Sequence, residues 1–307
     1  MSKLLEQVDS LLDGTVTVHN LNEPFDDHDK LITVVSEAEL TLSSLFPQLR
    51  EDLPNPVLDI HPTIRHDQQE AVRDPVSSEY VLHFDGSCEP IRPSASLVVA
   101  REAGLDASPT RFVSTAGFFA LASEQGIFRN FDATDVDSIF GYSAYYSQTQ
   151  ALWLALEPNN ERLKEVVRND LARDKVDSRD ELINKLDADP KRGKRKFPLI
   201  APHSITGADS IMIDAGVRHI GLASRATGTE LEVDQYDLDV AFINLRLLLA
   251  DTPRLEAEGI TAKVTPKTGF GVAFTKEGLH NQEPSSNEKS QLTKRRMSVL
   301  GLVEKAS

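Results

Sequence analysis

Cysteine is almost absent from this sequence: Cys88 is the only one among 307 residues. A single cysteine excludes a disulfide within the chain, and it excludes a zinc site built from several thiolates of this chain. A sequence of this kind is typical of a reducing compartment, so we expect a cytoplasmic protein.

Long apolar runs are also missing. A helix that spans a bilayer needs about 20 predominantly apolar residues, and no stretch of the sequence approaches that length. The first residues, MSKLLEQVDSLLDG, contain acids where a signal peptide needs its uninterrupted apolar segment. We therefore expect a soluble protein without a membrane partner.

Bases are fewer than acids. The chain has 33 Lys and Arg against 48 Asp and Glu, a formal net charge of −15. Such a surface repels phosphate backbones and anionic lipid unless the bases gather on one face. Hydrophobic residues make up 40% of the chain and charged residues 26%, which is typical of a globular protein with a packed core.

The common nucleotide-binding and hydrolase motifs are lacking as well. The sequence contains no GxSxG elbow, no phosphate-binding loop and no GxGxxG. His61 and His66 are five residues apart, so they lack the helical spacing of a zinc protease pair. His203 and His219 have no sequence partner that would indicate a catalytic triad.

The order of local patterns predicts an α+β fold: a β-rich core with a helical insertion, an extended N-terminal arm and a polar C-terminal tail. The expected boundaries are 1–75 for the helical, proline-punctuated arm, 76–275 for the core with its insertion at about 142–190, and 276–307 for the tail.

Apolar spacing and turn residues predict the individual elements. Helices are expected over 2–13 and 236–251, where apolar residues recur every three or four positions. Prolines at 47–76 argue against long regular structure there. Strands are expected over 79–85, 95–102 and 110–123, and a hairpin over 260–274. The segment MSVLGLVEK near the end is a small apolar patch that could dock on a neighbour.

The stretch EYVLHFDGSCEP, residues 79–90, has the most enzyme-like chemistry of the chain. His83 and Asp85 fall on one face of the expected strand, since side chains alternate along a strand. We expect His83 to be a structural histidine. We expect Asp85 to end a core strand beside Gly86 with turn chemistry, and the alternative is that it binds a metal ion.

FDGSCEP followed by Pro93 resembles the first strand of archaeal-type ribonuclease H. In that family the acid helps to hold magnesium, so the resemblance implies Asp85 as a Mg²⁺ ligand. The family brings a glutamate from the following helix, and this sequence has Gln148 at the matching position. The resemblance therefore requires other acids, and the candidates are Glu157, Asp209 and Asp214.

A second resemblance involves GLASRATGTELEVDQYDLDVAF, which is similar to the nucleotidyltransferase signature. It implies that Asp237 and Asp239 bind magnesium from one strand face. The alternative is that both acids lie in the first turn of a helix, where carboxylates suit the positive end of the helix dipole. Ala223 and Ser224 stand where that signature has Gly-Ser.

Two basic clusters stand out from the acidic background. One is an expected exposed loop that contains Lys191, Arg192, Lys194, Arg195 and Lys196, and the other is Lys294 to Arg296. Each could contact a phosphate. We favour contacts with acidic patches of a neighbouring subunit, such as the one at Asp132, Asp135 and Asp137.

Extended arms, an acidic body and the lack of a complete catalytic set together favour a structural protein that self-assembles, in concrete form a virus particle (capsid or tail) subunit. Its partners would be copies of itself or other subunits, it would need no cofactor, and it would reside in the virion. The alternative is a Mg²⁺-dependent nuclease with a ribonuclease-H-like core around Asp85.

Overall fold

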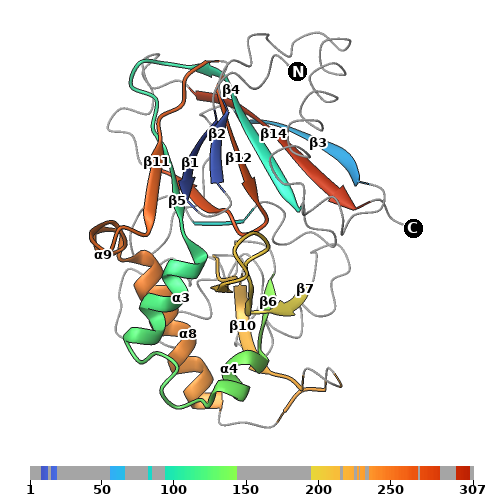
Figure 1. Cartoon of the computed structure of the whole chain (residues 1–307), viewed down its shortest axis with the longest axis vertical. Helices are drawn as coiled ribbons and strands as arrows, with labels where there is room; N and C mark the ends of the chain where they lie inside the picture. Colours follow the sequence, from blue (N-terminus) through green and yellow to red (C-terminus); the bar gives the residue numbers. More distant parts are fainter. Residues whose placement is uncertain are drawn as a thin grey trace, which may run out of the picture.

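The computed structural model describes a defined set of residues: 8–12, 15–18, 56–65, 82–84, 94–143, 195–214, 217–224, 227, 229–231, 235–268, 270–283 and 295–304. In Figure 1 the larger strands lie in the upper half of the molecule, and the helices α3, α4 and α8 lie below them.

A large antiparallel sheet forms the upper half. Within the described residues its six strands run in the order β1-β2-β12-β4-β14-β3. Their bounds are Val8–Leu12, Thr15–Val18, Gly271–Thr275, Ala95–Ala103, Arg295–Glu304 and Pro56–Arg65. Every neighbouring pair is antiparallel.

A smaller antiparallel sheet accompanies the large one. Its described strands run in the order β11-β5-β13, with bounds Thr261–Val264, Thr110–Val113 and Leu279–Gln282. The short segment 82–84 extends this sheet beyond β13, because His83 forms an antiparallel bridge with His280. Segments about 200 residues apart in sequence thus lie side by side.

The two sheets pack face to face through aromatic and branched side chains. The rings of Phe112 in β5 and Phe274 in β12 have centroids 5.3 Å apart. Val272, Val98 and Val264 join this cluster. Because side chains alternate along a strand, Arg111 next to Phe112 points to the other side of the small sheet. The result is a two-layer β-sandwich with an apolar interior.

The lower half consists of helices and short strands. Its helices are α3 (Thr115–Glu124), α4 (Ala133–Ser138), α8 (Gln235–Ala250) and α9 (Thr252–Ala257). One short sheet has the order β10-β6-β7, with bounds Val217–Leu222, Ile139–Ser143 and Arg195–Pro198. A hairpin pairs β8 (Ile200–Pro202) with β9 (Asp209–Ile211).

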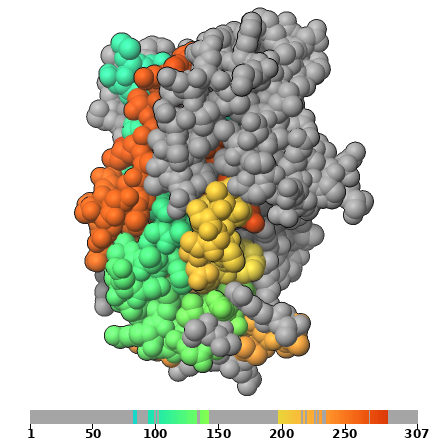
Figure 2. All heavy atoms as spheres, in the orientation of Figure 1, coloured from blue at the N-terminus to red at the C-terminus, as the bar shows by residue number. Residues whose placement is uncertain are grey.

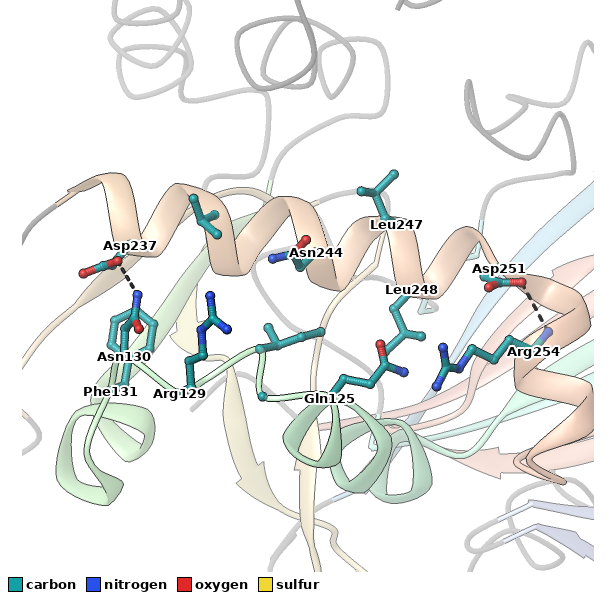
Figure 3. A pocket seen from close by; sticks show the side chains of 13 residues that line it. Gln125, Arg129, Asn130, Phe131, Asp237, Asn244, Leu247, Leu248, Asp251 and Arg254 are labelled. Carbon is teal, nitrogen blue, oxygen red and sulfur yellow. Dashed lines mark hydrogen bonds between the residues drawn. The ribbon is translucent and has the colours of Figure 1, made fainter.

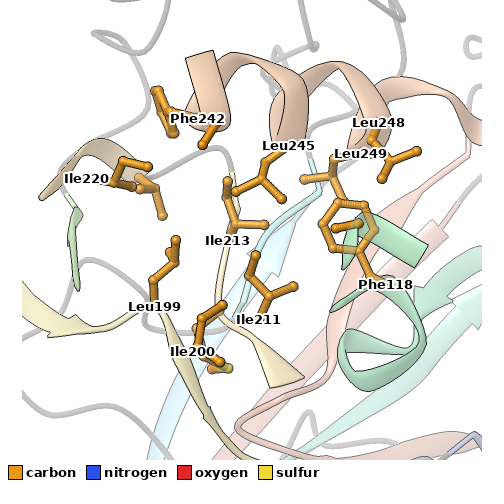
Figure 4. Close-up of a cluster of buried hydrophobic side chains, with 14 of the residues drawn as sticks. Phe118, Leu199, Ile200, Ile211, Ile213, Ile220, Phe242, Leu245, Leu248 and Leu249 are labelled. Carbon is orange, nitrogen blue, oxygen red and sulfur yellow. The ribbon is translucent and has the colours of Figure 1, made fainter. Parts of the chain in front are cut away.

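The main hydrophobic core lies where α3, α8 and the β8–β9 hairpin meet. Figure 4 shows Phe118 of α3 and Leu245 of α8 above Ile200, Ile211 and Ile213. Leu82 and Phe84, which flank His83, belong to the same core. The segment 82–84 is therefore anchored on one face by this core, while His83 points away from it.

The predicted helix at 236–251 is confirmed as α8, whose apolar face is buried as the spacing indicates. The predicted strand at 110–123 is only partly right, because β5 ends at Val113. Ser114 stops the strand: its hydroxyl accepts a hydrogen bond from the Gly117 backbone N–H at 3.0 Å and caps α3.

Two predictions for the N-terminal region differ from the structure. The expected helix over 2–13 contains strand β1, which pairs with β2. The sequence Asp13-Gly14 between them is the strongest short signal for a hairpin, and the helical spacing of leucines concealed it. The proline-rich region contains the ten-residue strand β3. It tolerates Pro56 and Pro62 because Pro56 is its first residue and β3 lies at the sheet edge.

The C-terminal predictions also need correction. The expected hairpin over 260–274 yields two strands, β11 and β12, that belong to different sheets. Val264 and Val272 pack in the cluster between the sheets, so the chain crosses from one layer to the other. The expected polar tail after 276 contains β13 and the interior strand β14. The predicted helical insertion at 142–190 lies almost wholly outside the described residues.

No helix in the described part of the chain is long and apolar enough to cross a membrane.

Candidate functional site

Two histidines face each other on neighbouring strands of the small sheet. The backbone N–H of His83 donates to the carbonyl of His280 at 2.9 Å, and the N–H of His280 donates to the carbonyl of His83 at 3.0 Å. Residues paired in this way carry their side chains on the same face of the sheet. Their imidazole rings accordingly lie with centroids 4.5 Å apart and planes tilted by 48°.

The ring of His280 has a defined orientation and tautomer. Its Nδ1 lies 2.9 Å from the carbonyl oxygen of Gly278, which can only accept a hydrogen bond. Nδ1 therefore carries a proton, and in the neutral ring Nε2 presents a lone pair. A second hydrogen bond of this kind is what fixes the free nitrogen of metal-binding histidines.

Aromatic side chains from both sheets surround His280. Its ring stacks on Phe112 with centroids 5.4 Å apart, and it lies 4.9 Å from the ring of Phe274. Only 7% of His280 is exposed. The pair of histidines thus sits at the edge of the sandwich interior, in a setting that excludes much of the water.

The residue whose carbonyl orients His280, Gly278, has no room for a side chain. A Cβ on Gly278 would overlap Cδ2 of Phe274 and lie 2.8 Å from its Cγ. The tight approach of the β12–β13 turn to Phe274 therefore depends on Gly278.

The two rings fit a shared metal ion. Two imidazoles that bind one ion at about 2.1 Å and at right angles have centroids roughly 4.5 Å apart, which is the spacing observed. Within the described residues no three His, Cys, Asp or Glu side chains gather as a metal site. Asp85, two residues after His83, lies outside the described residues, so any third ligand from that position rests on sequence spacing.

Only some of the acids predicted from the sequence lie near the histidine pair in the described structure. Glu157 and Gln148 lie outside the described residues, as Asp85 does. Asp214 is buried, and its Oδ2 accepts a hydrogen bond from the Phe84 backbone N–H at 3.1 Å. Asp209 is exposed at the start of β9.

Asp237 and Asp239 lie in α8, as the helical alternative predicted. Asp237 accepts a hydrogen bond from the Asn130 side chain at 2.6 Å, and Asp239 accepts one from Gln235 at 2.9 Å. The nucleotidyltransferase resemblance is wrong, because it needs both acids on one strand.

The basic loop is described only in part. Arg195 and Lys196 begin β7, opposite Ser143 and Tyr142 of β6, so they belong to a strand. Lys191, Arg192 and Lys194 lie outside the described residues, and so does Lys294. In the proposed acidic patch, Asp132 caps α4 by accepting a hydrogen bond from the Asp135 backbone N–H at 2.8 Å. The roles given to these charges stay predictions.

His280 was missed by sequence reasoning. It stands in a segment that was expected to be a polar tail, about 200 residues from its partner. A signal did exist, since His83 and Asp85 form an H-x-D pair on one expected strand face. A second histidine in a later strand completes the pattern of two histidines and one carboxylate.

A separate hollow of about 380 Å³ lies along α8 (Figure 3). It is lined by the 125–131 segment, one side of α8 and the beginning of α9, and neither His83 nor His280 contributes to it. Arg129 and Arg254 face it together with Asp237 and Asp251, so its charges balance. The hollow is therefore distinct from the histidine pair and favours no charged ligand.

Comparison with solved structures shows the fold. Over 97% of both chains, the protein is similar to a Burkholderia xenovorans protein assigned as an alpha-ketoglutarate dependent 2,4-D dioxygenase, with a TM-score of 0.50 and 11% sequence identity. It is also similar to a taurine dioxygenase from Burkholderia xenovorans, with a TM-score of 0.50 and 14% identity over 97% of this chain and 89% of that one.

A further match is a Burkholderia xenovorans protein assigned as an alpha-ketoglutarate-dependent taurine dioxygenase, with a TM-score of 0.46 and 11% identity; this chain spans 66% of its length. No protein-family description matches the sequence. No curated protein matches it in sequence either.

These matches overturn the functional predictions made from sequence. The virus particle hypothesis is wrong, and so is the magnesium nuclease alternative, because the solved structures matched over nearly the whole chain are dioxygenases. The expected arms and the missing motifs misled the interpretation. The described residues of the expected arm and tail include the sheet strands β1, β2, β3, β13 and β14, and the two histidines of the candidate site are far apart in sequence. What the comparison shows of this chain is a dioxygenase-like fold.

Proposed function

We propose that the protein is an Fe(II)- and alpha-ketoglutarate-dependent dioxygenase, with His83, Asp85 and His280 as its iron ligands. The observation that carries the proposal is the His83–His280 pair, with rings 4.5 Å apart inside a fold that resembles dioxygenases. One of the similar structures, matched over 97% of both chains, is described as alpha-ketoglutarate dependent.

The ligand set follows from strand geometry. His83 and His280 are direct partners on adjacent strands, which places both imidazoles on one face. Asp85 is two positions beyond His83, so continued strand alternation would put its carboxylate on that same face. Two histidines and one carboxylate leave coordination positions open, and this set is diagnostic of non-heme Fe(II) oxygenases.

Bound iron and alpha-ketoglutarate would supply the oxidising chemistry with molecular oxygen. The chain's own residues hold and shield the site. The carbonyl of Gly278 keeps the proton on Nδ1 of His280, which leaves Nε2 free to bind. Phe112 and Phe274 exclude water from one side of His280.

Metal titration tests the proposal. Calorimetry under anaerobic conditions with Mn(II), which resists oxidation by air better than Fe(II), should show one ion bound per chain. His83→Ala and His280→Ala should each weaken binding by more than about 100-fold, since removal of a ligand costs more than removal of a supporting group. Asp85→Asn should weaken it as well. Alpha-ketoglutarate consumption that requires Fe(II) and oxygen is the matching activity.

His219→Ala, a histidine substitution in β10, serves as the control and should bind Mn(II) like the unmodified chain. Mn(II) binding that survives both His83→Ala and His280→Ala would contradict the proposal.

A further inference from the structure

The β8–β9 hairpin touches both segments that carry the histidines. Its strands pair from Ile200↔Ile211 to Pro202↔Asp209. Ile200 and Ile211 are anchored in the main core below α8 (Figure 4). In Figure 2 the residues around the hairpin form the yellow group of spheres near the middle of the face, beside the green of α3. The hairpin thus connects a packed core to the sandwich.

The first contact is made by Asp214, just after β9. Its carboxylate is buried, with 1% of the residue exposed, and Oδ2 accepts a hydrogen bond from the backbone N–H of Phe84 at 3.1 Å. Phe84 stands between His83 and Asp85 in the chain. The carboxylate therefore holds the backbone at the residue next to His83.

The second contact is made by Glu277 in the turn between β12 and β13. It is 3% exposed. Its Oε1 accepts from the Ser204 backbone N–H at 3.2 Å, and its Oε2 accepts from the Ser204 hydroxyl at 2.8 Å. Glu277 precedes His280 by three residues, and its carbonyl accepts from the Leu279 N–H at 2.8 Å.

Glu277 is held in its charged form. Burial by itself would raise the pKa of Glu277, but the polar side chains of Thr275 and Ser204 and the nearby basic residues His203 and Lys276 outweigh it, so the pKa lies below its ordinary value. A carboxylate at neutral pH can accept both hydrogen bonds from Ser204.

The hairpin turn is well suited to hold Ser204 in place. The N–H of His203 donates to the carbonyl of Ala208 at 2.8 Å, and the N–H of Gly207 donates to the carbonyl of His203 at 2.8 Å. The N–H of Ile205 donates to Nδ1 of His203 at 3.2 Å. These hydrogen bonds order the turn on both sides of Ser204.

We infer that Asp214 and Glu277 are positioning residues, through which the β8–β9 hairpin sets the placement of the two histidine-bearing segments relative to each other. This inference rests on the proposed metal site. Neither carboxylate binds the ion; each acts through the backbone that carries a ligand. Supporting partners of this kind typically contribute 10–100-fold to metal affinity.

The test uses the full chain with Co(II), whose visible absorption reports ligand geometry, and Mn(II) affinity from calorimetry. Asp214→Ala and Glu277→Ala should each weaken Mn(II) binding by about 10–100-fold and alter the Co(II) spectrum. Asp214→Asn keeps an oxygen that can accept from Phe84 and should restore both. Asp209→Ala removes an exposed acid of the same hairpin and should change neither.

Stability is followed in parallel by the thermal unfolding of each metal-free variant. If one alanine variant does not fold, the other alanine variant and Asp214→Asn decide the question. Affinity and Co(II) spectra that match the unmodified chain in folded Asp214→Ala and Glu277→Ala overturn the inference and leave the proposed function standing. Failure of the unmodified chain to bind Mn(II) overturns both.

Discussion

At the scale of single residues, the ring of His280 packs against Phe112 and Phe274 and is oriented by a hydrogen bond to the backbone. The carbonyl of Gly278 receives its Nδ1–H at 2.9 Å, so the position of that carbonyl decides where Nε2 points. Gly278 in turn sits against Phe274, with no room for a Cβ. A methyl group added at this glycine would therefore displace the carbonyl that orients the His280 ring.

We predict that Gly278→Ala lowers Mn(II) affinity by about tenfold or more, because the new methyl must push Phe274 or the turn away and so displace the carbonyl that orients His280. Overpacking of this kind should also destabilise the protein by about 1–3 kcal/mol. Calorimetry and chemical denaturation measure the two effects.

Gly221→Ala provides a matched control, since its Cβ would lie 2.6 Å from Cζ of Phe140, in β6 of the lower half. Gly221→Ala should lower the free energy of unfolding by a comparable amount but leave the Mn(II) affinity unchanged. Equal losses of affinity in both variants would show that general destabilisation, and not the Gly278 carbonyl, is responsible.

At the scale of secondary-structure elements, a charge network around the buried Arg111 joins the small sheet to α9. Arg111 of β5 is 3% exposed, and it donates to Glu283 at 2.6 Å and to the Thr252 hydroxyl at 3.0 Å. Lys263 of β11 bridges Glu256 and Glu283 at 2.8 Å each. The strands β5 and β11, the helix α9 and the residue after β13 are thus connected on the face of the sheet opposite Phe112.

We predict that Glu283→Gln destabilises the protein by about 2 kcal/mol at pH 7, because the buried guanidinium of Arg111 loses the acidic partner at 2.6 Å and keeps Glu256 only at 3.7 Å. Burial would raise the pKa of Glu283, but hydrogen bonds from Lys263 and Arg111 outweigh it and hold the pKa below its ordinary value. The contribution of Glu283 is therefore complete above the unfolded pKa of about 4.3 and is lost as the pH falls through the folded pKa.

Urea denaturation of the unmodified protein and of Glu283→Gln between pH 3 and 7 measures the difference in their free energies of unfolding. The difference in stability should shrink as the pH falls below about 4.3, because protonated Glu283 resembles the amide. A difference that is constant over this range would contradict the role given to the charge.

At the scale of the whole molecule, the C-terminal segment is part of the central sheet. β14 lies between β4 and β3 and pairs with both in antiparallel register, from Arg295↔Ala103 onward and from Met297↔Arg65 onward. β13 in the same region brings His280 to His83. The far end of the sequence therefore completes both the sandwich and the histidine pair, and whether the chain associates with copies of itself stays a prediction.

We predict that a chain ending at residue 293 loses cooperative thermal unfolding, since removal of β14 separates β3 from the sheet and leaves β4 with an unpaired edge. A chain ending at Glu304 keeps β14 and should unfold like the full-length protein. Circular dichroism during heating compares the two. A cooperative transition in the shorter chain would mean that β14 is dispensable for the fold.

An element could be predicted from the sequence where the pattern that indicates it lies within one segment of the chain. The helix α8 could be predicted because its apolar spacing is contained within one segment. β1, β3 and β14 were missed, since their partners lie elsewhere in the chain and only those partners make them strands. For the same reason His83 and Asp85, which are two residues apart, were singled out together, whereas the distant His280 was missed.

The sequence by itself determined an acidic protein without a disulfide, the α8 helix, and the H-x-D pair on one expected strand face. Only the tertiary structure decided that His280 lies opposite His83 and that the last strand is internal. It also decided which carboxylates of the core, Asp214 and Glu277, support the segments that carry these histidines. Pairing between strands distant in sequence depends on backbone hydrogen bonds, which every residue type can form, and local residue patterns therefore do not encode it.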